Sequence, residues 1–419
     1  MVELKTLKSV DVVTHMQNNF NYNNIARTPG HIDYDLFIKL PPMIPFDDVV
    51  VAYLNALSKA LNKDSRTRIY PDVATFSFFC RKANILQIKK KFVKDDEIKL
   101  GRGLIFHIAP SNVPVNFAYS LIVGLLSGNS NIVRVPSKKY DQVEIIIDAI
   151  NTLDDKGEHP IVSERIVLVS YDRSHIATKH FSSVCDVRII WGGDETIRQI
   201  RENALPPRAF DITFADRYSI CLINADKFAE ELEPHKIAIG FYNDTYLFDQ
   251  NACTSPHLVL WVGSKDHVKK AQQVFWRNLK KIVESDYEVQ PVIAVDKLTS
   301  FFNQAIQMRK IKLISKGDNL LWRVSLDKLS NDIDDFRCNS GYFSEYHVND
   351  IDELSSVINN KYQTLAYYGF SKEQMADFIL KLHPFGVDRI VPIGRTTDFS
   401  LIWDGYNLIN SLSRIIEIS

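Results

Sequence analysis

The chain has little of several residue types that mark specialised protein classes. Of its 419 residues only five are Cys, and none of them forms a C-x-x-C pair. A disulfide framework is therefore not expected, and a reducing, cytoplasmic compartment fits this cysteine usage. Gly and Pro number 16 each, which is below the usual combined share of about 12%. This low count predicts many regular elements, and the ordinary 45% of apolar and 24% of charged residues excludes collagen-like and disordered classes.

Long apolar runs and an excess of one charge are also missing. The most apolar stretch, residues 117–126, is shorter than the ~20 residues of a membrane span. Residues 1–5 carry early charge and no apolar core, so we expect no signal peptide. The 50 Lys and Arg against 51 Asp and Glu give a formal net charge of −1. This balance argues against a nucleic-acid-binding surface along the whole chain.

What the sequence does contain is an alternation of apolar runs and helical periods. Strands are predicted at 104–108, 131–135, 165–170 and 187–191, and helices at 113–126, 140–153, 174–185 and 193–203. Because these strands are apolar throughout, they predict a parallel sheet covered on both faces. The pattern restarts after 218–224, with a strand at 257–262, helices at 265–283, 295–308 and 372–383, and strand-like runs near 292, 311, 342 and 363. Two α/β domains are expected from this length and pattern.

A first candidate site is the segment Pro110-Ser111-Asn112-Val113-Pro114, where a predicted strand ends and a predicted helix begins. In an open α/β sheet the carboxyl ends of the strands are where ligands bind. An amide held between two prolines, as Asn112 is, could stabilise an oxyanion. The alternative is a helix N-cap Asn flanked by turn prolines.

A second candidate site is the glycine pair in Trp191-Gly192-Gly193-Asp194-Glu195, between a predicted strand and a predicted helix. Glycines allow close backbone approach, and a helix N-terminus attracts phosphate. The motif is shorter than a dinucleotide fingerprint, so a tight strand-to-helix turn is the alternative.

A third candidate site is Cys253, in the polar segment 249–256 (DQNACTSP) between two apolar runs. The other four cysteines lie in or beside apolar patterns, where Cys is usually a small buried hydrophobe. Polar flanks and a nearby helix N-terminus would favour the thiolate and hence nucleophilic attack. An unreactive loop cysteine is the alternative. The eleven His show no H-x-x-x-H or H-E-x-x-H spacing, so no metal site is expected.

Taken in chain order, these three sites resemble the aldehyde dehydrogenase superfamily, and most closely its acyl-CoA reductase (LuxC-type) family. The similarity covers roughly residues 100–415. Its most specific part is 107–137 (HIAPSNVPVNFAYSLIVGLLSGNSNIVRVPS), and 250–256 (QNACTSP) resembles the family's nucleophile segment. Residues 386–394 (GVDRIVPIG) and 403–405 (WDG) resemble its C-terminal signature, to which the sequence assigns no chemical role.

This resemblance implies an aldehyde dehydrogenase-like α/β fold with the active site in a cleft between two domains. It implies an N-terminal region and Rossmann-type NADP-binding domain over 1–230, an α/β catalytic domain over 231–390 and a C-terminal segment at 391–419. By the resemblance Cys253 is the nucleophile, and the Asn112 side chain with the Cys253 backbone N–H forms the oxyanion hole. The cofactor contacts it implies are Pro110, Ser111, Arg134, Ser137, Lys138, Gly192 and Gly193.

The resemblance also bears on the cofactor. Arg134 falls where oxidising relatives keep a Lys on the adenosine ribose, and Ser137 falls where NAD-preferring relatives often have a Glu. With Arg134 and Lys138 present and no acid between them, a 2′-phosphate would be attracted. NADPH is the cofactor predicted. The second cofactor Glu of the relatives has no clear match near 337–343.

One departure from hydrolytic relatives is informative. They carry a Glu that activates water, whereas the matching stretch 210–224 holds no Glu and only Asp211 and Asp216 nearby. We therefore expect an acyl-enzyme that resists hydrolysis and a thiol or thioester as acyl partner. The implied function is NADPH-dependent reduction of an acyl-CoA or acyl-protein thioester, with a fatty acyl group, to the aldehyde through a thioester on Cys253.

The partners implied are the thioester itself, an acyl-protein synthetase subunit and further copies of the chain, with neither nucleic acid nor membrane span. Three alternatives stay open. A Cys-dependent acyltransferase or thioesterase would pair Cys253 with a base such as His257. A reductase of acyl phosphates would share the Cys chemistry. A catalytically silent interaction subunit is disfavoured because Asn112 and Cys253 are both present.

Overall fold

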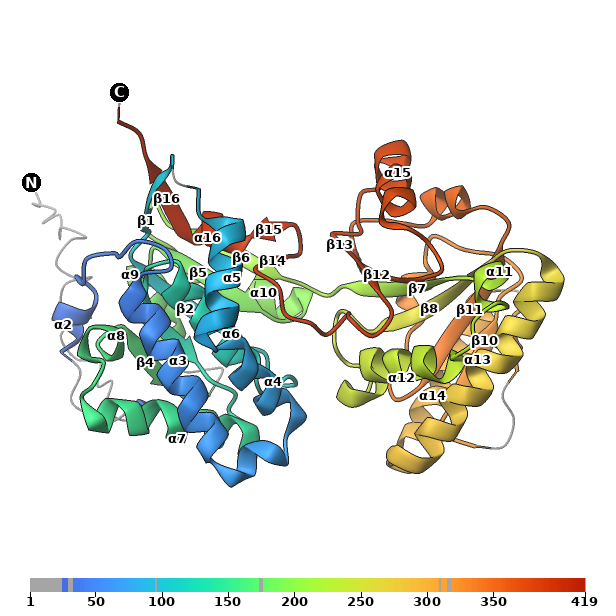
Figure 1. Cartoon of the computed structure of the whole chain (residues 1–419), viewed down its shortest axis with the longest axis horizontal. Coiled ribbons are helices and arrows are strands. Elements are labelled where there is room, and N and C mark those ends of the chain that lie inside the picture. Colours follow the sequence, from blue (N-terminus) through green and yellow to red (C-terminus); the bar gives the residue numbers. More distant parts are fainter. Residues whose placement is uncertain are drawn as a thin grey trace, which may run out of the picture. The chain divides into compact units, whose positions relative to one another are not determined.

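The computed structural model describes residues 25–28, 33–94, 96–172, 176–308, 310–314 and 318–418. The chain forms two compact units, which Figure 1 colours along the sequence. The first unit comprises Met1–Ala215 and Asn407–Ser419, and the second comprises Asp216–Tyr406. Residues 1–5, on which the expectation of no signal peptide rests, lie outside the described ranges. So does residue 174, where the helix 174–185 was predicted to begin.

The first unit is built on a five-stranded sheet of order β4-β3-β2-β5-β6. Its strands are β2 (Leu104–Ile108), β3 (Ser130–Arg134), β4 (Ile166–Val169), β5 (Val187–Trp191) and β6 (Phe210–Phe214). Every neighbouring pair is parallel. The predicted parallel sheet is thus confirmed, and four of its strands follow the apolar runs of the sequence.

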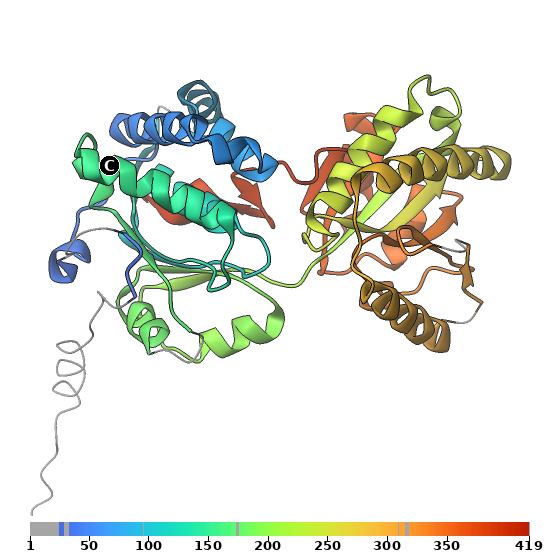
Figure 2. The ribbon, with the colours of Figure 1, turned by 90° about the horizontal axis from the view of Figure 1, so that it is seen from below.

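Helices cover both faces of this sheet. The helices are α2 (Tyr34–Phe37), α3 (Asp48–Lys63), α4 (Pro71–Phe79), α5 (Lys82–Phe92), α6 (Asn116–Leu126), α7 (Asp141–Lys156), α8 (Pro160–Ser163), α9 (Ala177–Val184) and α10 (Asp194–Arg201). Figure 2 shows α3 and α7 along one face and α9 and α10 along the other. On the second face Phe106 of β2 packs with Phe181 of α9 and Ile197 of α10. Burial on both faces explains why these strands carry no polar alternation.

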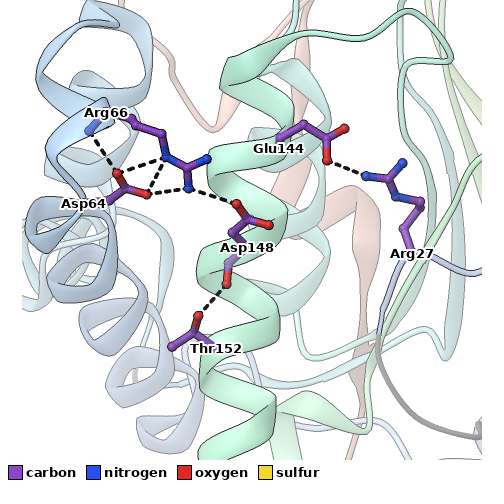
Figure 3. Close-up of polar contacts among 6 residues, drawn as sticks. All are labelled: Arg27, Asp64, Arg66, Glu144, Asp148 and Thr152. Carbon is purple, nitrogen blue, oxygen red and sulfur yellow. Dashed lines mark hydrogen bonds and ion pairs between the residues drawn. The ribbon is translucent and has the colours of Figure 1, made fainter.

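The outer surface of α7 is tied to its surroundings by charged contacts (Figure 3). Arg66, in the 3-10 helix η2 (Ser65–Arg68), binds Asp64 at 2.7 Å and Asp148 of α7 at 2.9 Å. Glu144, one turn earlier on α7, pairs with Arg27 at 2.6 Å. These pairs are partly exposed, so each adds less than about 1 kcal/mol. These pairs connect α7 with Arg27 and Arg66 and so help to hold the helix in place.

The end of the chain returns to the first unit. Strand β16 (Ser413–Ile416) pairs antiparallel with β1 (Ile98–Gly101), directly after helix α16 (Leu408–Leu412). Two side-chain contacts support this return: Asn129 donates to the Leu412 carbonyl at 3.0 Å, and Arg102 donates to the Ser411 carbonyl at 2.7 Å. The last residues therefore complete the first unit.

The second unit is built on a seven-stranded sheet of order β13-β12-β7-β8-β11-β10-β9. Its strands are β7 (Tyr218–Asn224), β8 (Pro256–Val262), β9 (Lys312–Leu313), β10 (Trp322–Ser325), β11 (Tyr342–Val348), β12 (Tyr362–Tyr368) and β13 (Arg389–Pro392). All pairs are parallel except β9 with β10. The units divide after Ala215 and after Tyr406, whereas the sequence interpretation placed borders after 230 and after 390. The reason is that β7 pairs with β8 and β12.

Two layers of helices sandwich this second sheet. They are α11 (Ala225–Phe228), α12 (Pro234–Thr245), α13 (Lys265–Asp286), α14 (Ile293–Gln307) and α15 (Lys372–Leu382). Figure 2 shows α12 and α13 on one side of the sheet and α14 on the other. Alternate residues of β8 divide between the layers, since Val259 packs with Phe241 and Leu258 packs with Phe378. The strand predicted near residue 292 is wrong, because Val292 is the N-cap of α14.

Candidate active site

Cys253 lies in a short loop between the 3-10 helix η3 (Tyr246–Phe248) and strand β8. The loop begins with two residues in the left-handed region, Asp249 (φ 51°) and Gln250 (φ 58°). The buried Gln250 amide then fixes it: Nε2 donates to the carbonyls of Pro256 (2.9 Å) and Tyr342 (3.0 Å). Its Oε1 accepts from the N–H groups of Gly341 (2.9 Å) and Tyr342 (3.0 Å). All four hydrogen-bonding positions of this side chain are used, so the loop is held to the start of β11.

A second clamp lies on the other side of the loop. The Ser219 hydroxyl donates to the Cys253 carbonyl at 2.6 Å and accepts from the Thr364 N–H at 3.2 Å. The pairing of β7 shifts register here, between Ser219 and Ile220 toward β8 and between Tyr362 and Leu365 toward β12. Such irregularities re-aim side chains next to a site. Ser219 therefore links the Cys253 loop to the distorted start of β12.

The Cys253 thiol is half-buried, whereas Cys80, Cys185 and Cys221 are fully buried. Burial and, to a smaller extent, the Asp404 carboxylate raise the pKa of Cys253 to about 11, against the opposing effects of Gln363 and Arg217. The expectation that the surroundings favour the thiolate is therefore wrong for the free protein. Its physical reason is plain: Cys253 occupies a turn before a strand and no helix begins there.

Three side chains to which the sequence interpretation gave no chemical role act on this thiol: Gln363, Asp404 and Arg217. Arg217 lies 3.9 Å from Asp404 and also pairs with Asp388. Asp404 and Gly405 have φ values of 47° and 74° and connect strands β14 (Ile402–Trp403) and β15 (Tyr406–Asn407). Two positive φ values are what a two-residue type I′ hairpin needs, and Asp-Gly is a favoured pair there. The Asp-Gly dipeptide was the one feature of the sequence that could have indicated a turn at this site. No local pattern pointed to Gln363.

Residues of the C-terminal signature segment 386–394 hold the loop that follows it in place. Arg389 donates to three carbonyls of the following loop, those of Arg395 (3.0 Å), Thr396 (2.7 Å) and Asp398 (2.6 Å). The buried Asp244 of α12 accepts from the N–H groups of Gly394 (2.6 Å) and Thr396 (3.0 Å). The loop before Asp404 is thereby fixed to the sheet and to α12.

In the first unit, the loops after β2 and β5 meet at the point where the strand order reverses. The order β4-β3-β2-β5-β6 places this switch point between β2 and β5, which is where open α/β sheets bind ligands. Pro110, Ser111 and Asn112 follow β2, and Gly192 and Gly193 follow β5. The structure therefore brings these two predicted segments to one edge of the sheet.

Asn112 is exposed and caps no helix. Helix α6 begins at Asn116, its N-cap is Val115, and no side chain caps it. The helix-cap alternative for Asn112 is therefore wrong. The preceding Ser111 is held by its carbonyl, which accepts from the Tyr140 hydroxyl at 2.8 Å.

The remaining predicted cofactor residues lie at the end of β3 and directly after it. Arg134 donates to the Tyr171 carbonyl at 3.1 Å and stacks over its ring at 4.8 Å. Ser137 and Lys138 are exposed. Gly192 and Gly193 lie directly before α10, whose first two residues, Asp194 and Glu195, are acidic.

The sequence analysis also considered Asp211, Asp216 and His257 as acids or bases, and the two aspartates are paired with arginines. Asp211 accepts from the buried Arg188 at 2.7 Å and 3.1 Å, and Asp216 lies 3.7 Å from Arg337. Burial lowers the pKa of His257 to about 3.

Within the described ranges no group of three or more His, Cys, Asp or Glu side chains could hold a metal ion. Over the same residues, no helix has the length and apolarity needed to cross a bilayer.

Comparison with solved structures defines the class of fold. Lactaldehyde dehydrogenase from Escherichia coli superposes with a TM-score of 0.61 at 11% identity, over 91% of this chain and 87% of that one. A 1-pyrroline-5-carboxylate dehydrogenase from Thermus, solved with bound NAD, gives 0.60 at 14% identity, over 91% and 82%. The fold is therefore that of the aldehyde dehydrogenases, as expected.

Comparison of sequences then gives the family. The acyl-CoA reductase (LuxC) family matches residues 84–415, and the chain belongs to it. The long-chain acyl-protein thioester reductase of Aliivibrio fischeri is 25% identical over 305 residues, which are 71% of this chain and 60% of that protein. The chain thus spans about three fifths of the length of that relative.

Proposed function

We propose that the chain is a reductase of acyl thioesters, which forms the aldehyde through a covalent thioester on Cys253 and uses NADPH. The observation that carries the proposal is the half-buried Cys253, on a loop fixed by Gln250 and Ser219. Family membership supports it, and the printed name of the relative supports a long-chain acyl-protein thioester as substrate. An acyl-protein synthetase subunit as donor, assembly with further copies and a cytoplasmic location complete the proposal.

In the first half-reaction the Cys253 thiol loses its proton and the sulfur attacks the thioester carbonyl carbon. The carbonyl oxygen becomes an oxyanion, which we assign to the Asn112 side-chain N–H and the Cys253 backbone N–H. The thiol of the acyl donor leaves with a proton, and the acyl group remains on Cys253. Asn112 supports this role because it is exposed and caps no helix.

When bound, a nicotinamide cofactor would supply the hydride that reduces the Cys253 thioester in the second half-reaction. The residues that would hold the dinucleotide are Pro110, Ser111, Gly192 and Gly193 at the switch point, with Ser137 nearby. Arg134 and Lys138 would attract a 2′-phosphate, and the Lys138 side chain is exposed. In this proposal the first unit binds NADPH and the second performs the cysteine chemistry.

The structure favours reduction over the competing thiol chemistries. Asp211 is held by Arg188 at 2.7 Å, so it is a poor candidate for activating water against the acyl-enzyme. With a pKa of about 3, His257 is a weak base for an acyltransferase or thioesterase. The acyl-enzyme is therefore expected to persist until it is reduced. An acyl phosphate as donor would use the same Cys253 chemistry and is an outcome of the substrate test below.

The test is to mix the protein with long-chain acyl-CoA, with and without NADPH, and follow both cofactor oxidation and CoA release. The proposal predicts NADPH oxidation with equal aldehyde formation, and only one CoA released per chain when NADPH is omitted. Sustained CoA release without NADPH would instead support an acyltransferase or thioesterase. Turnover with an acyl phosphate and none with a thioester would change the leaving group and contradict the substrate assignment.

A further inference from the structure

The side chain of Gln363 occupies an unusual position in the second unit. It lies at the register shift of β12, one residue before Thr364, whose N–H donates to Ser219. Gln363 is 2% exposed, and hydrogen bonding from its side chain lowers the pKa of the Cys253 thiol. The side-chain amide nitrogen of Gln363 also donates a hydrogen bond to the Asp404 carboxylate. Gln363 therefore connects the sulfur of Cys253 with a buried acid.

Asp404 determines which end of the Gln363 amide faces the sulfur. A carboxylate only accepts hydrogen bonds, so the NH₂ group must turn toward it, and the second N–H of that group is left for another acceptor. The Gln363 carbonyl oxygen has no hydrogen-bond partner among the described residues. A buried acceptor without a hydrogen bond destabilises the folded protein. A functional role for the amide would explain why Gln363 keeps this orientation.

Asp404 is itself held firmly. Its side chain is only 3% exposed, the type I′ turn fixes its backbone, and Arg217 approaches at 3.9 Å. Arg217 is anchored in turn, because it donates to the carbonyls of Lys361 (3.1 Å) and Tyr362 (2.8 Å) next to Gln363. The turn, the arginine and the irregular start of β12 form one rigid frame around the amide.

We propose that Gln363 is a catalytic residue, which donates an amide N–H to the Cys253 sulfur whenever that sulfur carries negative charge, and that Asp404 is the positioning residue that orients it. This inference rests on the proposed function.

The sulfur carries negative charge at two points in the reaction. In the first half-reaction the Cys253 proton passes to the departing thiolate of the donor, as the new C–S bond forms and the old one breaks. After hydride addition the C–S bond to Cys253 breaks, the aldehyde forms and the sulfur leaves as a thiolate, which then takes a proton from water. Gln363 exchanges no proton in either step. It stabilises the nucleophile of the first and the leaving group of the second.

The charges around the sulfur explain why such a donor is needed. Burial and the Asp404 carboxylate both raise the pKa of Cys253, to about 11, while Gln363 and Arg217 oppose them. Arg389 also interacts electrostatically with Cys253, although its hydrogen bonds go to loop carbonyls. Gln363 is first among the groups that lower the thiol pKa.

The test measures the rate of Cys253 alkylation by iodoacetamide against pH, in a Cys338→Ser background because Cys338 is also half-buried. Gln363→Met keeps the length of the side chain and removes the N–H. A hydrogen bond to a charged group corresponds to roughly 10- to 100-fold in an equilibrium constant, so alkylation near pH 8 should slow by about that factor. The rates of the two proteins should converge at high pH, where every thiol is ionised.

The matched control is Gln304→Ala, which removes another buried amide of the same unit, bonded to Ser344 and Tyr342. Its alkylation rate should stay within about twofold of the parent, because the loss of a structural amide does not touch the sulfur. If Gln363→Met and Gln304→Ala slow alkylation equally, or neither does, Gln363 is only a packing residue and the inference is overturned.

Asp404→Ala tests positioning, because two effects oppose each other. Removing the carboxylate charge alone would lower the thiol pKa and speed alkylation. Releasing the Gln363 amide would slow it, and we expect the slower rate. A faster rate would overturn the positioning role.

The alkylation test uses no acyl donor, so it is independent of the proposed function. Acylation by acyl-CoA is measured separately on the parent protein. A parent that does not acylate contradicts the proposed function, whereas a parent that acylates together with an unaffected Gln363→Met contradicts only the role of Gln363.

Discussion

Replacing Gln250 by Ala should unfold the second unit more easily and disable the Cys253 loop. The Gln250 amide makes four hydrogen bonds, to Pro256, to both backbone groups of Tyr342 and to Gly341. At about 1 kcal/mol for each neutral hydrogen bond, the free energy of unfolding should fall by about 4 kcal/mol. Alanine keeps a Cβ, so the cost of the left-handed backbone at φ 58° is nearly unchanged and does not enter the difference.

The assay is urea unfolding followed by circular dichroism, with aldehyde formation measured in parallel. Gln304→Ala is a graded control: its amide bonds the Ser344 and Tyr342 hydroxyls, so about 2 kcal/mol should be lost with most activity kept. Gln250→Ala should lose both stability and activity. A loss below about 1 kcal/mol for Gln250→Ala would refute the reasoning, since buried backbone groups left unpaired must cost more than that.

Three further predictions concern the cofactor side and the C-terminal loop. Asn112→Ala should slow acylation and reduction by about 10²–10³-fold, as for the loss of one oxyanion donor, with the fold intact by circular dichroism; an unchanged rate would remove Asn112 from the oxyanion hole. Arg134→Ala should raise the Michaelis constant for NADPH more than that for NADH, and equal effects on both would show that Arg134 does not contact a 2′-phosphate. Burial raises the pKa of Asp244 from 3.8 to about 6. Its contribution to stability is therefore complete below pH 3.8 and is lost as pH rises through about 6, by about 3 kcal/mol. Asp244→Asn should flatten this slope in urea titrations, and an unaltered slope would assign it to other groups.

Much of the fold could be predicted because its strands are short, apolar and buried on both faces. The predicted runs at 104–108 and 187–191 coincide with β2 and β5, and the helix predicted at 265–283 is α13, three residues longer at its end. The helix predicted from 113 begins at Asn116 instead. Pro114 explains this, because the residue before a proline is disfavoured in helical geometry.

The site was less accessible to sequence reasoning. Cys253 stood out because its flanks are polar, and the resemblance supplied its role. Its neighbours Arg217, Gln363 and Asp404 lie 36 to 151 positions away in the chain. Parallel pairing of β7 with β8 and β12 brings Arg217 and Gln363 close to Cys253, and the turn between β14 and β15 adds Asp404. The raised pKa of Cys253 was missed for the same reason, since burial depends on packing that no local pattern records.

The most direct test of the central claim is intact-protein mass spectrometry after mixing with long-chain acyl-CoA in the absence of NADPH. The account predicts one added acyl group, mapped to Cys253 by peptide analysis, which disappears when NADPH is added and is never formed in Cys253→Ala. Acylation at another residue, or aldehyde formation by Cys253→Ala at an appreciable rate, would contradict covalent catalysis at this cysteine.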